Sequence, residues 1–167
     1  MPKSEQGVFL DRYHVIPRTL IFVTRGEQVL LLKGAPTKRL WANRFNGIGG
    51  HVEKGEDVLT AAERELREET GLQTDGLRFC GTLLVDTGEA VGIAIFILKG
   101  EYVHGEINPS PEGIPTWVTM DQLPDLPLVE DLSELLPRVM KMSEQTPPFF
   151  ARSYYDEEDK LRLVVRD

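Results

Sequence analysis

The sequence predicts an α/β protein in which a β-sheet lies between helices. β-rich runs occupy both ends of the chain, a segment with helical features lies between them at residues 58–70, and helical spacing returns at residues 129–142. The chain has 167 residues, of which 41% are hydrophobic. That is enough to bury a core, and we expect a single domain over residues 1–167.

The first part of the chain predicts a β-hairpin followed by an irregular loop. Two β-rich runs, residues 19–24 and 28–33, flank a short turn. An apolar stretch at residues 8–10 is a candidate for addition to a sheet edge. A polar loop covers residues 34–43, and the Asn-Gly-Ile-Gly-Gly run at residues 46–50 is too rich in glycine for regular structure.

The helix predicted at residues 58–70 has clear signals at both ends. Glu56 and Asp57 suit the positive end of its dipole, and Gly71 is typical of a helix stop. The helical period places a set of apolar side chains on one sector, where we expect them to pack into the core: Leu59, Ala62 and Leu66.

The second half of the chain predicts more strands, one helix and a closing hairpin. Strand-like runs cover residues 77–86, 90–103 and 116–119. A proline-rich loop at residues 108–115 contains Glu112, and the connection at residues 123–127 is broken. In the helix at residues 129–142, Pro137 is expected to kink or end the helix early. Two β-like runs around an acidic turn predict a C-terminal β-hairpin at residues 149–165.

Composition and charge exclude several classes of function. The net charge of −8 disfavours a broad basic face for nucleic acid, so we expect no nucleic-acid partner. No apolar run approaches the ~20 residues that span a bilayer, and the N-terminus has no signal-peptide pattern. We therefore expect a cytoplasmic protein without a membrane partner. The single cysteine, Cys80, lies in an apolar run and is expected to be a buried hydrophobic residue.

Three glutamates in the helix predict a metal site. At about 100° per residue, Glu65, Glu68 and Glu69 share one sector of the helix, where their charges repel. A divalent cation would relieve that repulsion, and hard oxygen ligands suit Mg²⁺ or Mn²⁺ better than zinc. The alternative is a solvated acidic face. The fixed spacing to residues 49–50, Glu56 and Gly71 favours the site.

The stretch from Gly50 to Leu72, GHVEKGEDVLTAAERELREETGL, resembles the signature of the Nudix hydrolases at every fixed position. That signature is Gly-x5-Glu-x7-Arg-Glu-apolar-x-Glu-Glu-x-Gly-apolar. The resemblance implies an α/β/α sandwich with a central mixed β-sheet. It also implies Mg²⁺-dependent hydrolysis of a nucleoside diphosphate that is linked to a further group.

The resemblance also assigns expected roles to the helix and its surroundings. The helix glutamates Glu65, Glu68 and Glu69 would hold metal together with the carbonyl oxygen of Gly49. Arg64 would orient the helix by pairing with carboxylates, and Glu56 is the expected partner.

Two acids outside that helix are candidates for a further metal ligand or for the base that activates water. They are Glu53 and Glu112. Glu112 lies about where relatives carry such a glutamate, although an ordinary loop acid is an equally good interpretation.

The residues flanking the signature resemble the MutT-like branch that hydrolyses oxidised purine nucleoside triphosphates such as 8-oxo-dGTP. In the run from Phe45 to Gly50, Asn46 would contact a purine edge, although Asn-Gly is also a common turn. Glu130 and Asp131 match an acidic pair that binds the base, or they begin a helix.

Members of that branch carry a tryptophan that stacks on the base, whereas this chain has Leu128 and Val129 at the corresponding position. Stacking would then fall to Phe149 or Phe45. The basic residues that are candidates for phosphate contacts are Lys33, Arg39 and Arg44.

We therefore expect metal-dependent hydrolysis of a purine nucleoside triphosphate, either canonical or oxidised, to the monophosphate and pyrophosphate. The alternatives are another diphosphate substrate, such as a nucleotide sugar or a dinucleoside polyphosphate, and a non-catalytic nucleotide-sensing module. The expected partner is a small nucleotide, and the chain is a monomer or a homodimer.

Overall fold

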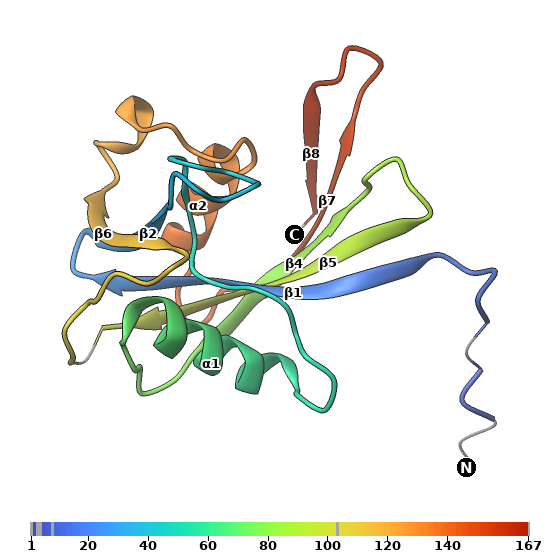
Figure 1. Ribbon diagram of the computed structural model, residues 1–167, viewed down its shortest axis with the longest axis horizontal. Helices are drawn as coiled ribbons and strands as arrows, with labels where there is room; N and C mark the ends of the chain where they lie inside the picture. Colours follow the sequence, from blue (N-terminus) through green and yellow to red (C-terminus); the bar gives the residue numbers. More distant parts are fainter. Residues whose placement is uncertain (1, 3–4, 8, 103, 167) are drawn as a thin grey trace.

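The computed structural model describes residues 2, 5–7, 9–102 and 104–166 (Figure 1). Its sheet has the strand order β3-β2-β1-β5-β4-β7-β8, with β6 paired to β2. The strands are β1 (His14–Arg25), β2 (Gln28–Gly34), β3 (Phe45–Asn46), β4 (Arg78–Val85), β5 (Val91–Glu101), β6 (Gly113–Thr119), β7 (Phe149–Tyr155) and β8 (Leu161–Arg166). The helices are α1 (Val58–Thr70), the 3-10 helix η2 (Leu123–Asp125) and α2 (Leu132–Lys141).

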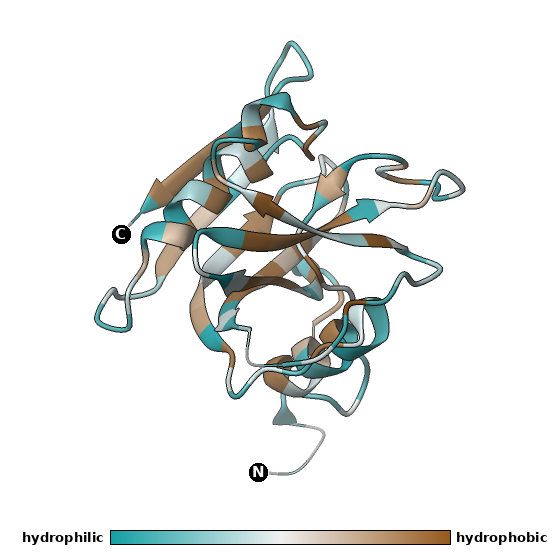
Figure 2. Ribbon diagram, turned by 90° about the vertical axis from the view of Figure 1, so that its left-hand side faces the viewer, coloured by the Kyte–Doolittle hydropathy of each residue, from teal (hydrophilic) through white to brown (hydrophobic). Residues whose placement is uncertain are grey.

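The sheet is mixed, as expected. β1 runs parallel to β5 and β4 parallel to β7, whereas β1–β2, β4–β5, β2–β6 and β7–β8 pair antiparallel. Helices α1 and α2 lie on opposite sides of β1 (Figure 1). Because successive strand residues point to opposite faces, Leu20 and Phe22 join the core under α2, while Ile21 and Val23 join the core under α1. Figure 2 shows hydrophobic residues gathered along the strands and hydrophilic residues in the turns.

The hairpin of β1 and β2 opens away from its turn, and the glycine run fills the gap. The two strands pair only at Thr24–Val29 and Arg25–Gln28. Closer to the start of β1, the segment after β3 pairs with β1 instead of β2. The Ile21 N–H donates to the Ile48 carbonyl at 2.7 Å, and the Thr19 N–H donates to the Gly50 carbonyl at 2.8 Å. This insertion fixes the glycine run beside β1.

Helix α1 has the predicted ends, because both are set by local chemistry. Asp57 caps it by accepting hydrogen bonds from the N–H groups of Leu59 and Thr60, and Gly71 ends it at a φ of 78°. Ala62 and Leu66 are buried as expected. Leu59, however, is 44% exposed, which corrects its predicted core position. It lies in the first turn of α1, and no contact in either core cluster includes it.

Helix α2 differs from its prediction at both ends. It begins at Leu132 because Val129 is held by tertiary pairing, its N–H donating to the Phe45 carbonyl at 3.0 Å. Pro137 does not end the helix, which continues to Lys141.

The remaining elements follow the sequence with small shifts. Strand β6 begins at Gly113, which shortens the expected loop. Residue 8 lies outside the described residues, and the exposed side chains of Phe9 and Leu10 belong to no strand. Cys80 is fully buried, as expected. No helix among the described residues is long and apolar enough to cross a membrane.

Candidate active site

A cleft of about 760 Å³ opens where the glycine run, α1, the loop before β3 and the start of α2 meet. Its floor is the face of the sheet that packs on α2, represented by Arg18, Leu20, Val85, Ile93, Ile95 and Ser153. At one end lie the helix glutamates, and at the other lie Asn46, Glu130 and Asp131. The cleft therefore joins an acidic end to a hydrogen-bonding pocket.

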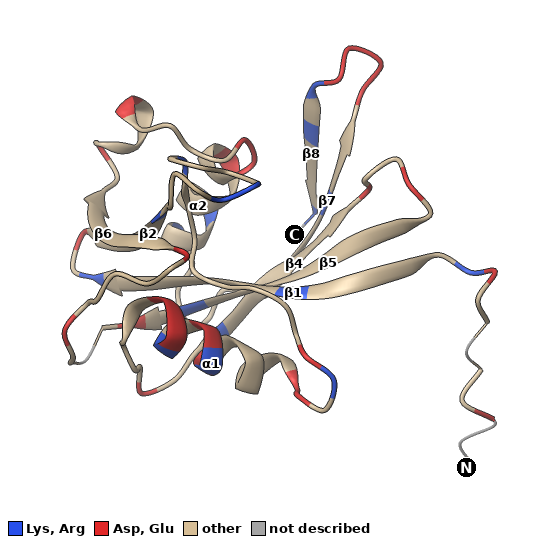
Figure 3. Ribbon diagram, in the orientation of Figure 1, with Lys and Arg blue, Asp and Glu red and all other residues tan. Residues whose placement is uncertain are grey.

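The glutamates Glu65, Glu68 and Glu69 all line this cleft, and Figure 3 shows acidic residues grouped on α1. Glu69 is only 5% exposed, and its Oε2 accepts a hydrogen bond from the Gly49 N–H at 2.9 Å. Burial raises the pKa of Glu69 to about 7, and the negative charges of Glu65 and Glu112 add to this effect. The raised pKa of Glu69 thus reflects mainly the cost of burying a carboxylate, and repulsion from the neighbouring acids adds to it.

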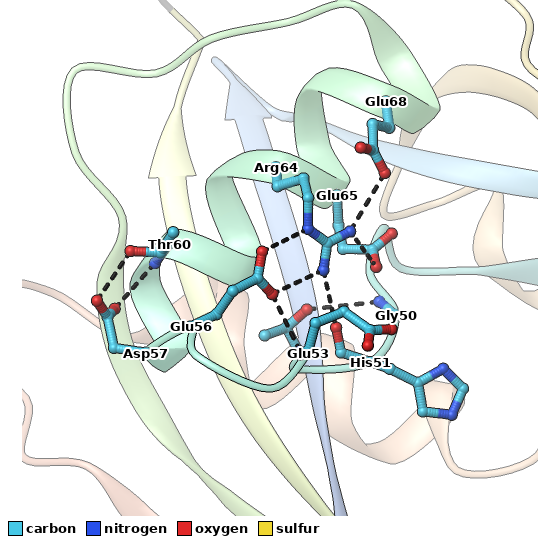
Figure 4. A network of polar contacts seen from close by, with 10 residues as sticks. Gly50, His51, Glu53, Glu56, Asp57, Thr60, Arg64, Glu65 and Glu68 are labelled. Carbon is cyan, nitrogen blue, oxygen red and sulfur yellow. Dashed lines mark hydrogen bonds and ion pairs between the residues drawn. The ribbon is translucent and has the colours of Figure 1, made fainter.

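Arg64 gathers the carboxylates around one guanidinium (Figure 4). It forms a bidentate pair with Glu56, with Nε–Oε1 at 2.7 Å and Nη2–Oε2 at 3.0 Å. Nη1 donates to Glu65 at 2.8 Å and to Glu68 at 3.2 Å, and Nη2 donates to the His51 carbonyl at 3.0 Å. The expected Arg64–Glu56 pair is thus present, and Arg64 connects α1 to the loop before it.

The glycine pair allows this arrangement because neither position has room for a Cβ. Gly49 has a φ of 142°, and a Cβ there would clash with the Thr19 carbonyl oxygen. At Gly50, a Cβ would occupy the place of the Glu65 carboxylate. The glycine pair therefore packs directly against both β1 and α1.

The chemistry of the donor set fits a hard divalent cation. Arg64 donates hydrogen bonds to Oε1 of Glu65 and Oε2 of Glu68, and the Gly49 N–H donates to Oε2 of Glu69. The second oxygen of each carboxylate has no hydrogen bond to a described residue. No group of three or more His, Cys, Asp or Glu side chains among the described residues is already arranged to hold a metal ion. Oxygen donors of this kind suit Mg²⁺.

The opposite end of the cleft offers an amide and a raised-pKa carboxyl group for hydrogen bonding. The Asn46 Oδ1 accepts from the Gly47 N–H at 2.8 Å, so the amide N–H groups of Asn46 remain available. Burial raises the pKa of Asp131, and the nearby charge of Glu130 raises it further. Glu130 itself is exposed at the rim, and Arg44 also lines the cleft, with Nη1 3.5 Å from the Leu128 carbonyl.

Comparison with known proteins decides the family. The model of the NUDIX domain matches residues 14–139. The chain belongs to the Nudix family. This Nudix hydrolase is 35% identical over 150 residues to the oxidized purine nucleoside triphosphate hydrolase of Mus musculus, which covers 89% of this chain and 93% of the mouse protein.

Two further relatives show the breadth of the family. The NAD-capped RNA hydrolase NudC of Pseudomonas aeruginosa is 32% identical over 122 residues, which is 72% of this chain but 42% of that protein. The crystal structure of the mMutator MutT protein from Bacillus halodurans superposes with a TM-score of 0.76 at 24% identity, covering 90% of this chain and 97% of that one. The structural likeness confirms the Nudix fold.

Several residues predicted for the site lie away from the cleft of this Nudix hydrolase. Phe45 and Phe149 are 8% and 2% exposed and pack in the core under α2, because large apolar rings gain most from full burial. Neither ring lines the cleft. Glu53, Lys33 and Arg39 have exposed side chains that do not line it either. Lys33 points out from β2 at 5.9 Å from the Phe45 ring, and the Glu53 N–H donates to Glu56 at 3.0 Å.

Other residues line the cleft without having been predicted. Trp41 and Tyr155 bring aromatic rings to it, and Lys38 forms an ion pair with Glu112 at 2.5 Å. Arg18 and Ser153 belong to its floor. Alternation carries a signal for Ser153, which lies on the inward side of the β-like run that begins at Phe149; Arg18 precedes the predicted run at residues 19–24 and has no such signal.

Proposed function

We propose that this Nudix hydrolase cleaves a purine nucleoside triphosphate to the monophosphate and pyrophosphate, with Mg²⁺ or Mn²⁺ as cofactor. The observation that carries the proposal is the single cleft with carboxylates at one end and Asn46 and Asp131 at the other. Its volume of about 760 Å³ lies in the range of small-molecule sites. The likeness to the mouse hydrolase along 89% of this chain supports the same substrate class.

The acidic end supplies the groups for attack at phosphorus. Glu65, Glu68 and Glu69, with the Gly49 carbonyl, would hold the cation, which neutralises phosphate oxygens and lowers the pKa of the attacking water. Arg64 is a positioning residue, because it holds two of these carboxylates and joins them to the loop at His51.

Glu112 is the candidate base for this reaction. It lines the cleft, whereas the exposed Glu53 does not. In the reaction, water adds to phosphorus as the bond to the bridging oxygen breaks. Lys38 lies beside Glu112 and adds positive charge for the phosphate chain.

The other end of the cleft suits a nucleobase. The free amide N–H groups of Asn46 can donate to acceptors on a purine edge. Asp131 adds a carboxyl group whose pKa is raised by burial, and this group can also contact the base edge. Trp41 and Tyr155 replace Phe45 and Phe149 as the aromatic residues available for stacking.

A nucleotide screen tests this proposal. Purified protein with Mg²⁺ is given canonical and oxidised nucleoside triphosphates, ADP-ribose, nucleotide sugars and dinucleoside polyphosphates, and pyrophosphate and orthophosphate are measured separately. We expect pyrophosphate from purine triphosphates and little orthophosphate. Turnover confined to the other diphosphates would refute the substrate class, and binding without any turnover would indicate a nucleotide-sensing module.

A further inference from the structure

Arg18 lies in the floor of the cleft, and no hydrogen bond or ion pair joins its side chain to a described residue. It lies on β1 opposite Ile95 of β5, on the same face as Leu20. Its Nε is buried and has no hydrogen-bond partner, and the ion pairs among the described residues do not include it. Burial lowers the pKa of Arg18, which reflects the cost of desolvating this charge. A buried polar group left unpaired in the free protein is typical of one that a ligand satisfies.

The backbone of Arg18 pairs with His51 near the acidic end, while its side chain lies on the face of β1 that forms the apolar floor of the cleft. Its neighbour Thr19 faces the other side of β1, where the Thr19 hydroxyl lies 3.4 Å from the Gly50 nitrogen beside the carboxylates. Arg18 faces the α2 side, where the floor continues through Ile95 and Ile93. A flat ring can lie on these apolar side chains while its edges meet polar groups.

Ser153 is a second unpaired group on the same floor. It is 1% exposed, and its Oγ has no hydrogen-bond partner. It lies on β7 opposite Val85, on the face that carries Arg18. β1 and β7 are three strand spacings apart, or about 14 Å between backbones. Arg18 and Ser153 therefore approach a base from opposite edges.

We propose that Arg18 is a specificity-determining residue that donates hydrogen bonds to a keto oxygen of the bound base, with Ser153 contacting the opposite edge. The inference rests on the proposed function and narrows it to keto-bearing purines. Arginine has only donors, so it can satisfy a carbonyl oxygen and cannot satisfy an exocyclic amino group. A site built to bond a given polar group discriminates strongly against the analogue that lacks it.

Two matched pairs of triphosphates test this inference. dITP and dATP differ in the 6-keto group, and 8-oxo-dGTP and dGTP differ in the 8-keto group. We compare kcat/KM within each pair for the wild type, Arg18→Met, Ser153→Ala and the control Arg166→Met, an exposed arginine on β8 outside the cleft. The wild type should prefer the keto member of at least one pair. Arg18→Met should reduce that preference at least about tenfold, Ser153→Ala should reduce it less, and Arg166→Met should retain it.

The outcomes separate this inference from the proposed function. A wild type that hydrolyses none of the four triphosphates overturns both. An equal loss of kcat/KM on all four in Arg18→Met, or an unchanged preference, overturns only the role of Arg18. Thermal unfolding without ligand gives an independent measurement, because removing an unpaired charge should leave the melting temperature equal or higher. A lower melting temperature together with an unchanged preference would assign Arg18 a structural role.

Discussion

A single guanidinium organises the acidic end of the cleft. Arg64 contacts three carboxylates and the His51 carbonyl, so the loop before α1 and the middle of α1 share one set of bonds. Glu69 lies outside that set, buried against the Gly49 N–H. Arg64 therefore reduces repulsion for Glu65 and Glu68, while Glu69 remains the carboxylate with the strongest need of a cation.

Glu69→Gln tests that view of the buried carboxylate. The amide retains the shape and can still accept from Gly49, but it removes the negative charge, so we expect kcat to fall at least about a hundredfold with the fold intact. Turnover and circular dichroism measure the two effects. Glu63→Gln, at an exposed position of the same helix outside the cleft, serves as the control and should retain activity. An active Glu69→Gln protein would refute the assigned role.

Asp131 predicts a pH effect on stability. Burial raises the folded pKa of Asp131 above the ordinary unfolded value of about 3.9. The free energy of unfolding of the wild type therefore falls as the pH rises from that unfolded pKa through the folded pKa. Asn cannot ionise, so the melting temperature of Asp131→Asn minus that of the wild type should increase from pH 4 to pH 8. Asp125→Asn, at an exposed site, should show a constant difference. A difference for Asp131→Asn that shrinks with pH would contradict the burial argument.

Among single residues, the sequence predicted charged groups better than aromatic ones. Spacing alone assigns Glu65, Glu68 and Glu69 to one side of α1, because the helix period is fixed. Phe45 and Phe149 illustrate the limit, since either a core or a stacking role suits an aromatic ring and only the packing of α2 on the sheet distinguishes them. The floor position of Arg18 depends on parallel pairing with β5, which lies more than 70 residues away.

Among the elements, α1 and α2 show what local sequence can specify. The bounds of α1 follow from Asp57 and Gly71, which act within a turn of the helix ends. The start of α2 depends on the hydrogen bond between Val129 and Phe45, two segments that are far apart in the chain. Elements limited by their own caps are thus predictable, and elements limited by tertiary pairing are not.

The glycine pair before α1 predicts two different defects. Gly49→Ala would place a Cβ against backbone at a positive φ, so we expect a loss of about 1–3 kcal/mol in unfolding free energy. Gly50→Ala would meet only the flexible Glu65 carboxylate, so it should lower kcat with a smaller effect on stability. Denaturant unfolding and turnover measure the two effects. Gly76→Ala is the control, because its Cβ would meet no atom within 4 Å. Equal stability losses at residues 49 and 50 would contradict this distinction.

At the scale of the whole molecule, net charge limits how an anionic substrate can bind. The chain carries a charge of −8, and several of its carboxylates are concentrated in the cleft. A triphosphate approaching this surface meets repulsion unless cations accompany it. The acidic composition and the proposed cofactor are thus two aspects of one electrostatic requirement.

Chelation tests this requirement directly. EDTA should abolish turnover, and Mg²⁺ or Mn²⁺ in excess should restore it, because the glutamates and the phosphates share the cation. Mg²⁺ should also raise the melting temperature of the wild type more than that of Glu69→Gln, which gives a readout independent of activity. Turnover that is insensitive to chelation would contradict the proposed cofactor.

The hairpin of β7 and β8 contributes Ser153, Tyr155 and Leu161 to the cleft. This hairpin lies beyond residue 139, where the match to the family model ends. The glutamates of α1 and this wall of the cleft thus lie in separate stretches of the sequence. Substitutions in β7 and β8 can therefore change the shape of the cleft while every residue of the signature persists.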